Sequence, residues 1–147
     1  MVYNASTHQI KYNERAPPEI LHRSSLFATL TEVDVEIIPL EVHYYVDPAG
    51  NIPFSEWLDS FKDKTTLATI YARLGRLRNG LLGDNIWVAP GIFELRIHYG
   101  PGYRIYFGRI ETTIILLLCG GDKKSQTQDI HLAQDYWLGY LRRRRHE

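Results

Sequence analysis

The stretch Ile92–Gln128 reads IFELRIHYGPGYRIYFGRIETTIILLLCGGDKKSQTQ, and its first half alternates between apolar and polar residues. The polar side chains of the first alternating segment share one face, and they are Glu94, Arg96 and His98. This two-residue period predicts a β-strand with one buried face. The segment 103–110 alternates in the same way after the turn sequence Gly100-Pro101-Gly102. The two segments therefore predict a β-hairpin.

A three-residue turn sets the register expected for this hairpin, because it pairs Tyr99 with Tyr103. That register brings together two polar pairs across the strands: His98 with Arg104, and Arg96 with Tyr106. We expect this face of the hairpin to be open to solvent and to carry cations, an imidazole and a phenol.

The next segment, 113–118, is continuously apolar, which predicts an interior strand covered on both faces. The sequence Cys119-Gly120-Gly121-Asp122 is expected to end the strand and to deliver Lys123 beside the polar face of the hairpin. Cys119 follows the buried strand directly, so we interpret it as a packed small hydrophobic residue and not as a nucleophile.

The composition fits one domain, because 147 residues with 44% hydrophobic content suffice for a core. A single cysteine excludes an internal disulfide framework and a cysteine-rich zinc site. No segment has the length of a membrane span or the pattern of a secretory signal, so we expect a cytoplasmic protein. The net charge is zero, but residues 1–61 are acidic and residues 62–147 are basic. The basic part suits a polyanion such as RNA, or an ordinary solvated surface.

Residues 1–34 are expected to form an N-terminal extension of unknown role, in which 20–30 could form a short helix, and residues 35–147 the folded domain. Within the domain the patterns predict a strand at 35–46, in which Pro39 indicates an edge position or a bulge. They also predict a helix opened by Pro53, a helix capped by Thr65 or Thr66 and ended by Asn79-Gly80, a short strand at 84–89 and a helix at about 127–142. The expected fold is α+β: a small, mainly antiparallel sheet in β-α-α-β-β-β-α order, packed by two N-terminal helices and a C-terminal helix. The second helix carries Arg73, Arg76 and Arg78 on its exposed side, and Arg142–Arg145 form a solvated tail or contact phosphate.

The motifs of nucleotide-binding loops, zinc hydrolases and serine hydrolases are missing from the sequence. The residues left for chemistry are expected on one side of the sheet: Arg96, His98, Arg104, Tyr106 and Lys123. They suit metal-free, cofactor-free cleavage of RNA, in which arginines bind the phosphate and His98 transfers protons near neutral pH. Tyr106 would stack on a base or assist proton transfer. The alternative is structural: Arg96 pairs with Glu94 or with a carboxylate of a helix, and His98 is an ordinary cross-strand neighbour.

Two motifs resemble the RelE/ParE superfamily of type II toxins, in particular its HigB-like branch of addiction-module killer proteins. They are ELRIHYGPGYRIYF at 94–107 and LLLCGGDKKSQTQDI at 116–130, preceded by the helix sequence FSEWLD at 54–59. The resemblance covers roughly residues 35–141 and implies a small antiparallel sheet packed by two helices. It also implies a cytoplasmic endoribonuclease that cuts translated mRNA, often on the ribosome, and is neutralised by a cognate antitoxin, often a helix-turn-helix protein.

By this resemblance Arg104 matches the phosphate-binding arginine, while Arg96, Lys123 and Lys124 supply further cations for RNA. Arg73, Arg76 and Arg78 would form a solvated surface or face the antitoxin. His98 has no secure counterpart, so the acid and base stay open. Two other functions remain: a ParE-like inhibitor that binds DNA gyrase and cleaves nothing, and an inactive relative that retains only antitoxin binding.

Overall fold

A five-stranded sheet forms the centre of the computed structural model, which describes residues 2–4, 9–11 and 37–147. The strands lie in the spatial order β3-β7-β6-β5-β4. Their bounds are β3 Glu41–Tyr44, β4 Asn85–Ala89, β5 Ile92–Ile97, β6 Tyr103–Ile110 and β7 Ile114–Asp122. β3 runs parallel to β7, and the other neighbouring strands are antiparallel. The sheet is therefore mainly antiparallel, as expected.

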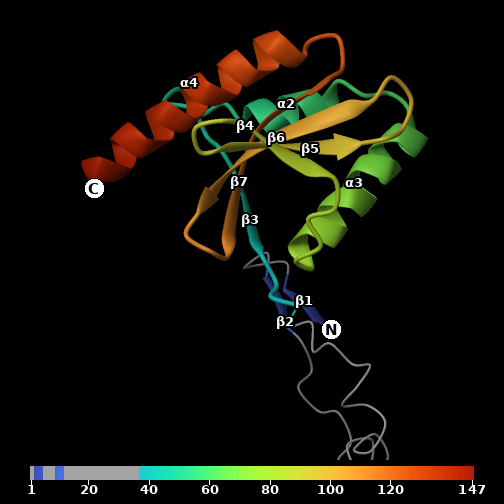
Figure 1. Ribbon diagram of the computed structural model, residues 1–147, viewed down its shortest axis with the longest axis horizontal. Helices are drawn as coiled ribbons and strands as arrows, with labels where there is room; N and C mark the ends of the chain where they lie inside the picture. The colour runs from blue at the N-terminus through green and yellow to red at the C-terminus, as the bar shows by residue number, and fades with distance from the viewer. Residues whose placement is uncertain (1, 5–8, 12–36) are drawn as a thin grey trace, which may run out of the picture.

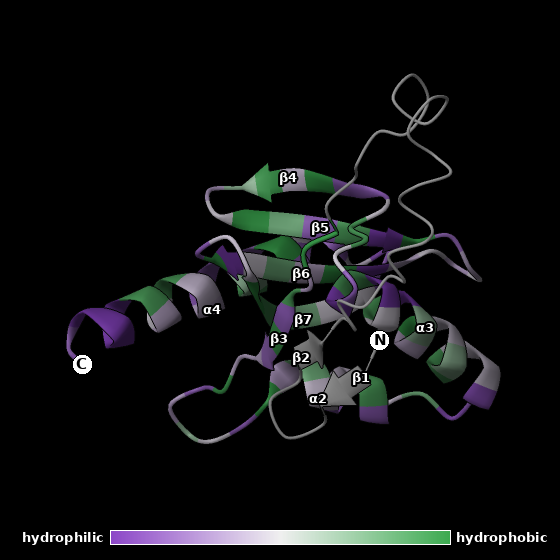
Figure 2. Ribbon diagram, turned by 90° about the horizontal axis from the view of Figure 1, so that it is seen from below, coloured by the Kyte–Doolittle hydropathy of each residue, from purple (hydrophilic) through white to green (hydrophobic). Residues whose placement is uncertain are grey.

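Helices cover both faces of this sheet (Figure 1). α2 (Pro53–Asp59) and α3 (Lys64–Arg78) pack on one face, where Phe54, Ile70 and Leu74 join a core with strand residues. α4 (Gln126–Arg145) packs on the other face through Ala133 and Trp137. The strands between these layers carry many of the strongly hydrophobic residues (Figure 2). This arrangement confirms the α+β class. The sheet has four strands after α2 and α3; the patterns predicted each of these segments as a strand, although the expected element order counted only three.

The N-terminal part contributes a separate two-stranded antiparallel ladder of β1 (Val2–Asn4) and β2 (Gln9–Lys11). The short helix considered for residues 20–30 lies outside the described residues. In the described part of the chain, no helix combines the length and hydropathy needed to cross a membrane.

The hairpin of β5 and β6 forms, but the expected register is wrong. Ile97, not Tyr99, pairs with Tyr103, so Arg96 lies opposite Arg104 and Glu94 lies opposite Tyr106. Tyr99 belongs to the turn, because its N–H donates to the carbonyl of Ile97 at 2.9 Å and its carbonyl accepts from Gly102 at 3.0 Å. The connection is therefore two residues longer than expected, and His98 is not part of β5.

The face of the hairpin that was expected to be open is covered by α4. Trp137 packs against Gly108 so closely that a Cβ on this glycine would lie 2.3 Å from the indole ring. As a result Glu94 and Tyr106 are fully buried. The strand alternation shows which residues share a face, but it cannot show that the polar face is also buried.

The remaining elements differ from expectation mainly at their ends. β3 is an edge strand, as predicted, but it begins only at Glu41, after Pro39. α3 is capped by Asp63 and not by a threonine: the Asp63 carboxylate accepts hydrogen bonds from the N–H groups of Thr65 and Thr66 at 3.1 and 3.3 Å. α3 ends at Asn79-Gly80 as expected, with Gly80 at a φ of 81°.

β7 lies between β3 and β6, which confirms the interior strand, but it continues through Cys119-Gly120-Gly121 to Asp122. These glycines therefore do not break the strand. They permit close packing instead: a Cβ on Gly120 would lie 2.3 Å from the Trp57 ring, and one on Gly121 would lie 1.8 Å from Asp129 Oδ2. Adjacent glycines thus let α2 approach one face of the strand and α4 the other.

Cys119 is buried, as expected, and its thiol donates to the carbonyl of Asp129 at 3.6 Å. Burial and the nearby Asp129 charge raise the pKa of Cys119 to about 12. Because the thiolate is the reactive species, we expect an aromatic disulfide reagent at pH 8 to label the native protein about 1,000-fold more slowly than the urea-unfolded protein. The absorbance of the released thiolate measures both rates. Equal rates would show that Cys119 is open to solvent.

Candidate functional site

Two arginines lie side by side at one end of the sheet. Arg96 on β5 pairs with Arg104 on β6, and Arg104 pairs in turn with Gly121 on β7. The side chain of Arg96 is 33% exposed, whereas that of Arg104 is only 12% exposed. The structure therefore brings the two predicted phosphate-binding arginines together, and Arg96 is the more exposed of the two.

Glu94 binds the side chains of both arginines. Its Oε1 accepts hydrogen bonds from Nε of Arg96 at 3.0 Å and from Nε of Arg104 at 3.1 Å, and its Oε2 accepts from Gln126 of α4 at 2.8 Å. Burial alone would raise the pKa of Glu94, but the hydrogen bonds from Arg96, Gln126 and Arg104 outweigh it and lower this pKa. The structural alternative, an ion pair of Arg96 with Glu94, is thus confirmed. The charges of Arg96, Arg104 and Glu94 sum to one net positive charge.

The orientation of the guanidinium groups follows from this arrangement. Both arginines use Nε to bind Glu94, so this contact does not involve their terminal nitrogens. Nη1 of Arg104 is buried and has no hydrogen-bond partner among the described residues. A buried guanidinium N–H without an acceptor is costly, and a ligand oxygen would satisfy it.

Tyr106 does not take the position expected of a catalytic or stacking residue. It is fully buried, and its hydroxyl has no hydrogen-bond partner within the described part of the chain. Burial and the neighbouring Glu94 carboxylate raise the pKa of Tyr106. The prediction that Tyr106 stacks on an RNA base is therefore wrong for this structure, because α4 covers the ring.

His98 lies in the turn after β5 and is 76% exposed. Its Nε2 lies 2.5 Å from Oδ2 of Asp84. The carbonyl of Asp84 also accepts the backbone N–H of Arg96 at 2.9 Å, which fixes Asp84 beside the arginine pair. Asp84 was missed in the sequence, because an aspartate before a short strand shows no sign of a partner in the next hairpin. His98 and Asp84 form an accessible imidazole–carboxylate pair next to Arg96.

Lys123 and Lys124 are exposed and directly follow β7. β5 and β7 run in the same direction on either side of β6, so Lys123 and His98 lie at the same end of the sheet. One strand, β6, lies between the two strands that these residues follow. The structure thus places Arg96, Arg104, His98 and Lys123 at one end of the sheet, whereas the sequence predicted that they share one side of it.

The arginines of α3 do not share one exposed surface. Arg73 is buried, and its guanidinium donates to the carbonyls of Leu81 and Leu82. The prediction that Arg73 faces an antitoxin is therefore wrong; the side chain instead fixes the segment after α3. Arg76 is exposed and Arg78 is partly buried.

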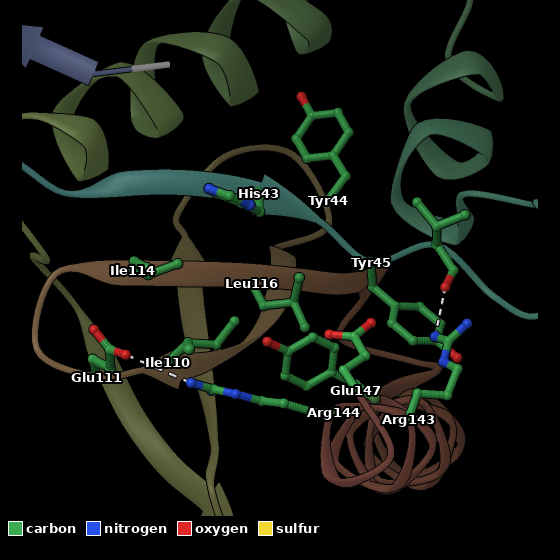
Figure 3. A pocket seen from close by; sticks show the side chains of 12 residues that line it. His43, Tyr44, Tyr45, Ile110, Glu111, Ile114, Leu116, Arg143, Arg144 and Glu147 are labelled. Atoms are coloured by element: carbon green, nitrogen blue, oxygen red, sulfur yellow. Dashed lines mark hydrogen bonds and ion pairs between the residues drawn. The ribbon is translucent and has the colours of Figure 1, made fainter. Parts of the chain in front are cut away.

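A hollow of about 480 Å³ lies at the end of the sheet opposite the arginine pair, between β3, the β6–β7 turn and the end of α4 (Figure 3). The arginines expected to form a tail continue α4 here. Arg144 pairs with Glu111 at 3.5 Å, and Arg143 donates to the carbonyl of Val46 at 2.7 Å (Figure 3). These contacts occupy two of the four arginines, so the end of α4 is part of the folded domain.

No cluster of three or more histidine, cysteine or acidic side chains that could hold a metal ion is found among residues 2–4, 9–11 and 37–147.

No protein-family model matches the chain. Over 83 residues the chain is 45% identical to an uncharacterized protein of Haemophilus influenzae, and the match covers 56% of this chain and 84% of that protein. Identity at this level over most of the Haemophilus influenzae protein shows common descent. The chain therefore belongs to the same family as this Haemophilus influenzae protein.

Proposed function

We propose that the protein is the toxin of a type II toxin–antitoxin system and that it is an endoribonuclease acting on translated mRNA. The observation that carries this proposal is the cationic end of the sheet, where buried Glu94 orients Arg96 and Arg104 next to the exposed pair of His98 and Asp84. The motif resemblance to RelE/ParE toxins supports the same function. It also supports a cognate antitoxin as the protein partner.

The reaction proposed is attack of an RNA 2′-hydroxyl on the adjacent phosphorus, with release of the 5′-oxygen. His98 takes the proton of the 2′-hydroxyl, and the Asp84 carboxylate stabilises the imidazolium that forms. The bond from phosphorus to the 5′-oxygen breaks, and this oxygen takes a proton from water, which leaves a 2′,3′-cyclic phosphate and a 5′-hydroxyl. The terminal nitrogens of Arg96 and Arg104 bind the phosphate oxygens, and Lys123 adds positive charge as the phosphorane develops. Tyr106 has no part in this scheme, because it is buried.

A gyrase-binding toxin without catalysis is the second candidate, and one observation favours it. Glu94 already neutralises one of the two arginines, and Arg104 is only 12% exposed. If α4 keeps this geometry in the cell, the basic end of the sheet would serve as a binding surface only.

The test is induced expression in a bacterial host with transcript 5′ ends mapped for the wild type, His98→Ala and His43→Ala. We expect growth arrest and new 5′ ends within reading frames for the wild type. His98→Ala should lower cleavage by about 100- to 10,000-fold, the usual contribution of a general base. His43 is a matched control, because it is also an exposed histidine 2.5 Å from a carboxylate but lies away from the arginine pair, on β3.

Three other outcomes would contradict the nuclease or the role given to His98. Arrest with intact transcripts and a DNA-damage response would establish the gyrase alternative. Arrest and cleavage that persist in His98→Ala would remove His98 from the mechanism. Absence of arrest in every variant would identify an inactive relative.

A further inference from the structure

A hollow of about 440 Å³ lies at the same end of the sheet as the arginine pair. It is bounded by α2, the β5–β6 turn, the end of β7 and the first turn of α4. The motif Gly120-Gly121-Asp122 forms one side of it. The function proposed above uses Lys123, which follows this motif, and leaves the glycines and acidic residues around the hollow unexplained.

One wall of this hollow is aromatic. Trp57, Phe61 and Tyr103 are partly exposed, and their rings meet edge to face: Trp57 lies 5.0 Å from Phe61, and Phe61 lies 5.2 Å from Tyr103. Aromatic side chains that keep part of their rings open to solvent are the usual surface on which unpaired nucleobases stack.

The wall on the other side of β7 carries a carboxylate, since Gly120 packs on Trp57 and Gly121 packs on Asp129. Asp129 is 9% exposed and lines the hollow, and its Oδ2 accepts the hydroxyl of Ser125 at 2.5 Å. Asp122 fixes this wall, because its Oδ1 accepts from the N–H groups of Lys124 and Ser125 at 2.9 and 3.1 Å. Burial raises the pKa of Asp129, the Ser125 hydrogen bond opposes this, and Asp122 adds to it. An ionised Asp129 would therefore be stabilised by a ligand that donates hydrogen bonds.

Glycines make the hollow possible. A side chain on Gly121 would collide with Asp129 and Ser125, and one on Gly120 would collide with Trp57. Gly121 also pairs with Arg104, so the hollow and the proposed phosphate site share one strand position. A nucleotide whose phosphate contacts the arginine pair would place its base near this hollow.

We infer that this hollow is the base-selective subsite of the RNA site, and that it prefers guanine. The aromatic wall takes the face of the base, and the Asp129 carboxylate accepts from the adjacent N1–H and N2–H donors of guanine. Uracil and adenine do not offer two adjacent donors, so they fit less well. This inference rests on the proposed RNA-directed function.

The direct test is calorimetric titration of the full chain with guanosine, inosine, adenosine and uridine 5′-monophosphates. A good bidentate contact predicts that guanosine monophosphate binds about 5- to 100-fold more tightly than uridine monophosphate. Inosine monophosphate lacks the 2-amino group and should fall between them. This comparison changes only the ligand and needs no variant that folds.

The role of Asp129 is tested with Asp129→Asn, which keeps the shape of the side chain and removes its charge and one acceptor. We expect this variant to lose the preference for guanosine monophosphate while it still binds all four nucleotides weakly. Asp135→Asn on the exposed side of α4 removes the same charge outside the hollow and should bind like the wild type. Equal binding of the four nucleotides by the wild type, or no binding at all, would overturn the inference.

The mapped transcripts separate this inference from the proposed function. Cleavage with a guanine preference that Asp129→Asn abolishes supports both. Cleavage without any base preference would contradict the proposed subsite and still support the nuclease. Selective binding of guanosine monophosphate by a protein that leaves transcripts intact supports the subsite and removes the nuclease.

Discussion

Glu94→Ala is expected to lower the free energy of unfolding by about 3–5 kcal/mol, the usual cost of breaking a buried ion pair from one side. Glu94 is fully buried and accepts three hydrogen bonds, from Arg96, Arg104 and Gln126. Its removal leaves Arg104, which is only 12% exposed, without the carboxylate that balances its charge. Urea unfolding followed by circular dichroism at pH 7 measures the change.

The control for this variant is Glu111→Ala, which removes an exposed ion pair with Arg144 at 3.5 Å. Exposed pairs contribute about 0–1 kcal/mol, so this variant should unfold almost like the wild type. Equal effects of the two substitutions would show that Glu94 is not the centre of a buried cluster.

The stability of Glu94→Gln, compared with that of the wild type across pH, tests the pH dependence of the same interaction. The folded state lowers the pKa of Glu94 below its ordinary value of 4.5. Its ionised form therefore contributes stability above the unfolded pKa, and this contribution is lost as the pH falls through the lower folded pKa. We expect the stability difference between wild type and Glu94→Gln to be largest at pH 7 and to narrow toward pH 3. A constant difference would contradict this linkage.

Trp137→Ala is expected to lower the free energy of unfolding by about 3–5 kcal/mol, because it leaves a cavity between α4 and the sheet. Trp137 is 8% exposed and fits against two glycines: a Cβ on Gly108 or Gly91 would lie 2.3 or 2.4 Å from the indole ring. The adjacent residue Leu138 is 48% exposed, so Leu138→Ala should change stability by only about 0.5 kcal/mol. Thermal and urea unfolding compare the two, and similar losses would show that Trp137 is not the anchor of α4.

Much of the fold could be predicted from local patterns. The apolar spacing of Phe54, Trp57 and Leu58 was sufficient for α2, and the continuous apolar run was sufficient for an interior β7. The hairpin register could not be predicted, because Tyr99 continues the alternation of β5 and yet bonds within the turn. The cap of α3 was misplaced for a similar reason: Asp63 and Thr65 are both good N-cap residues, and only the backbone decides between them.

The candidate site shows the limit of a strand pattern more clearly. The sequence predicted Arg96, Arg104 and Lys123 on one side of a sheet, and the structure has them at one end of it. It could not reveal that α4 buries the same face, so Tyr106 was expected in solvent and Glu94 was considered only as a surface partner of Arg96. The pairing of His98 with Asp84 depends on the fold around β4, and no local pattern encodes it.

The parallel pairing of β3 with β7 also bears on how the chain folds. β4, β5, β6 and β7 form an antiparallel meander whose contacts are close in sequence, whereas Glu41 must find Ile114 across most of the domain. Closing so long a loop costs entropy before any contact compensates it, and local contacts form faster than distant ones. The meander is therefore the natural folding nucleus, and β3 docks on it late. Substitutions in β3 should then speed unfolding and leave the folding rate almost unchanged, while substitutions in β6 should slow folding itself.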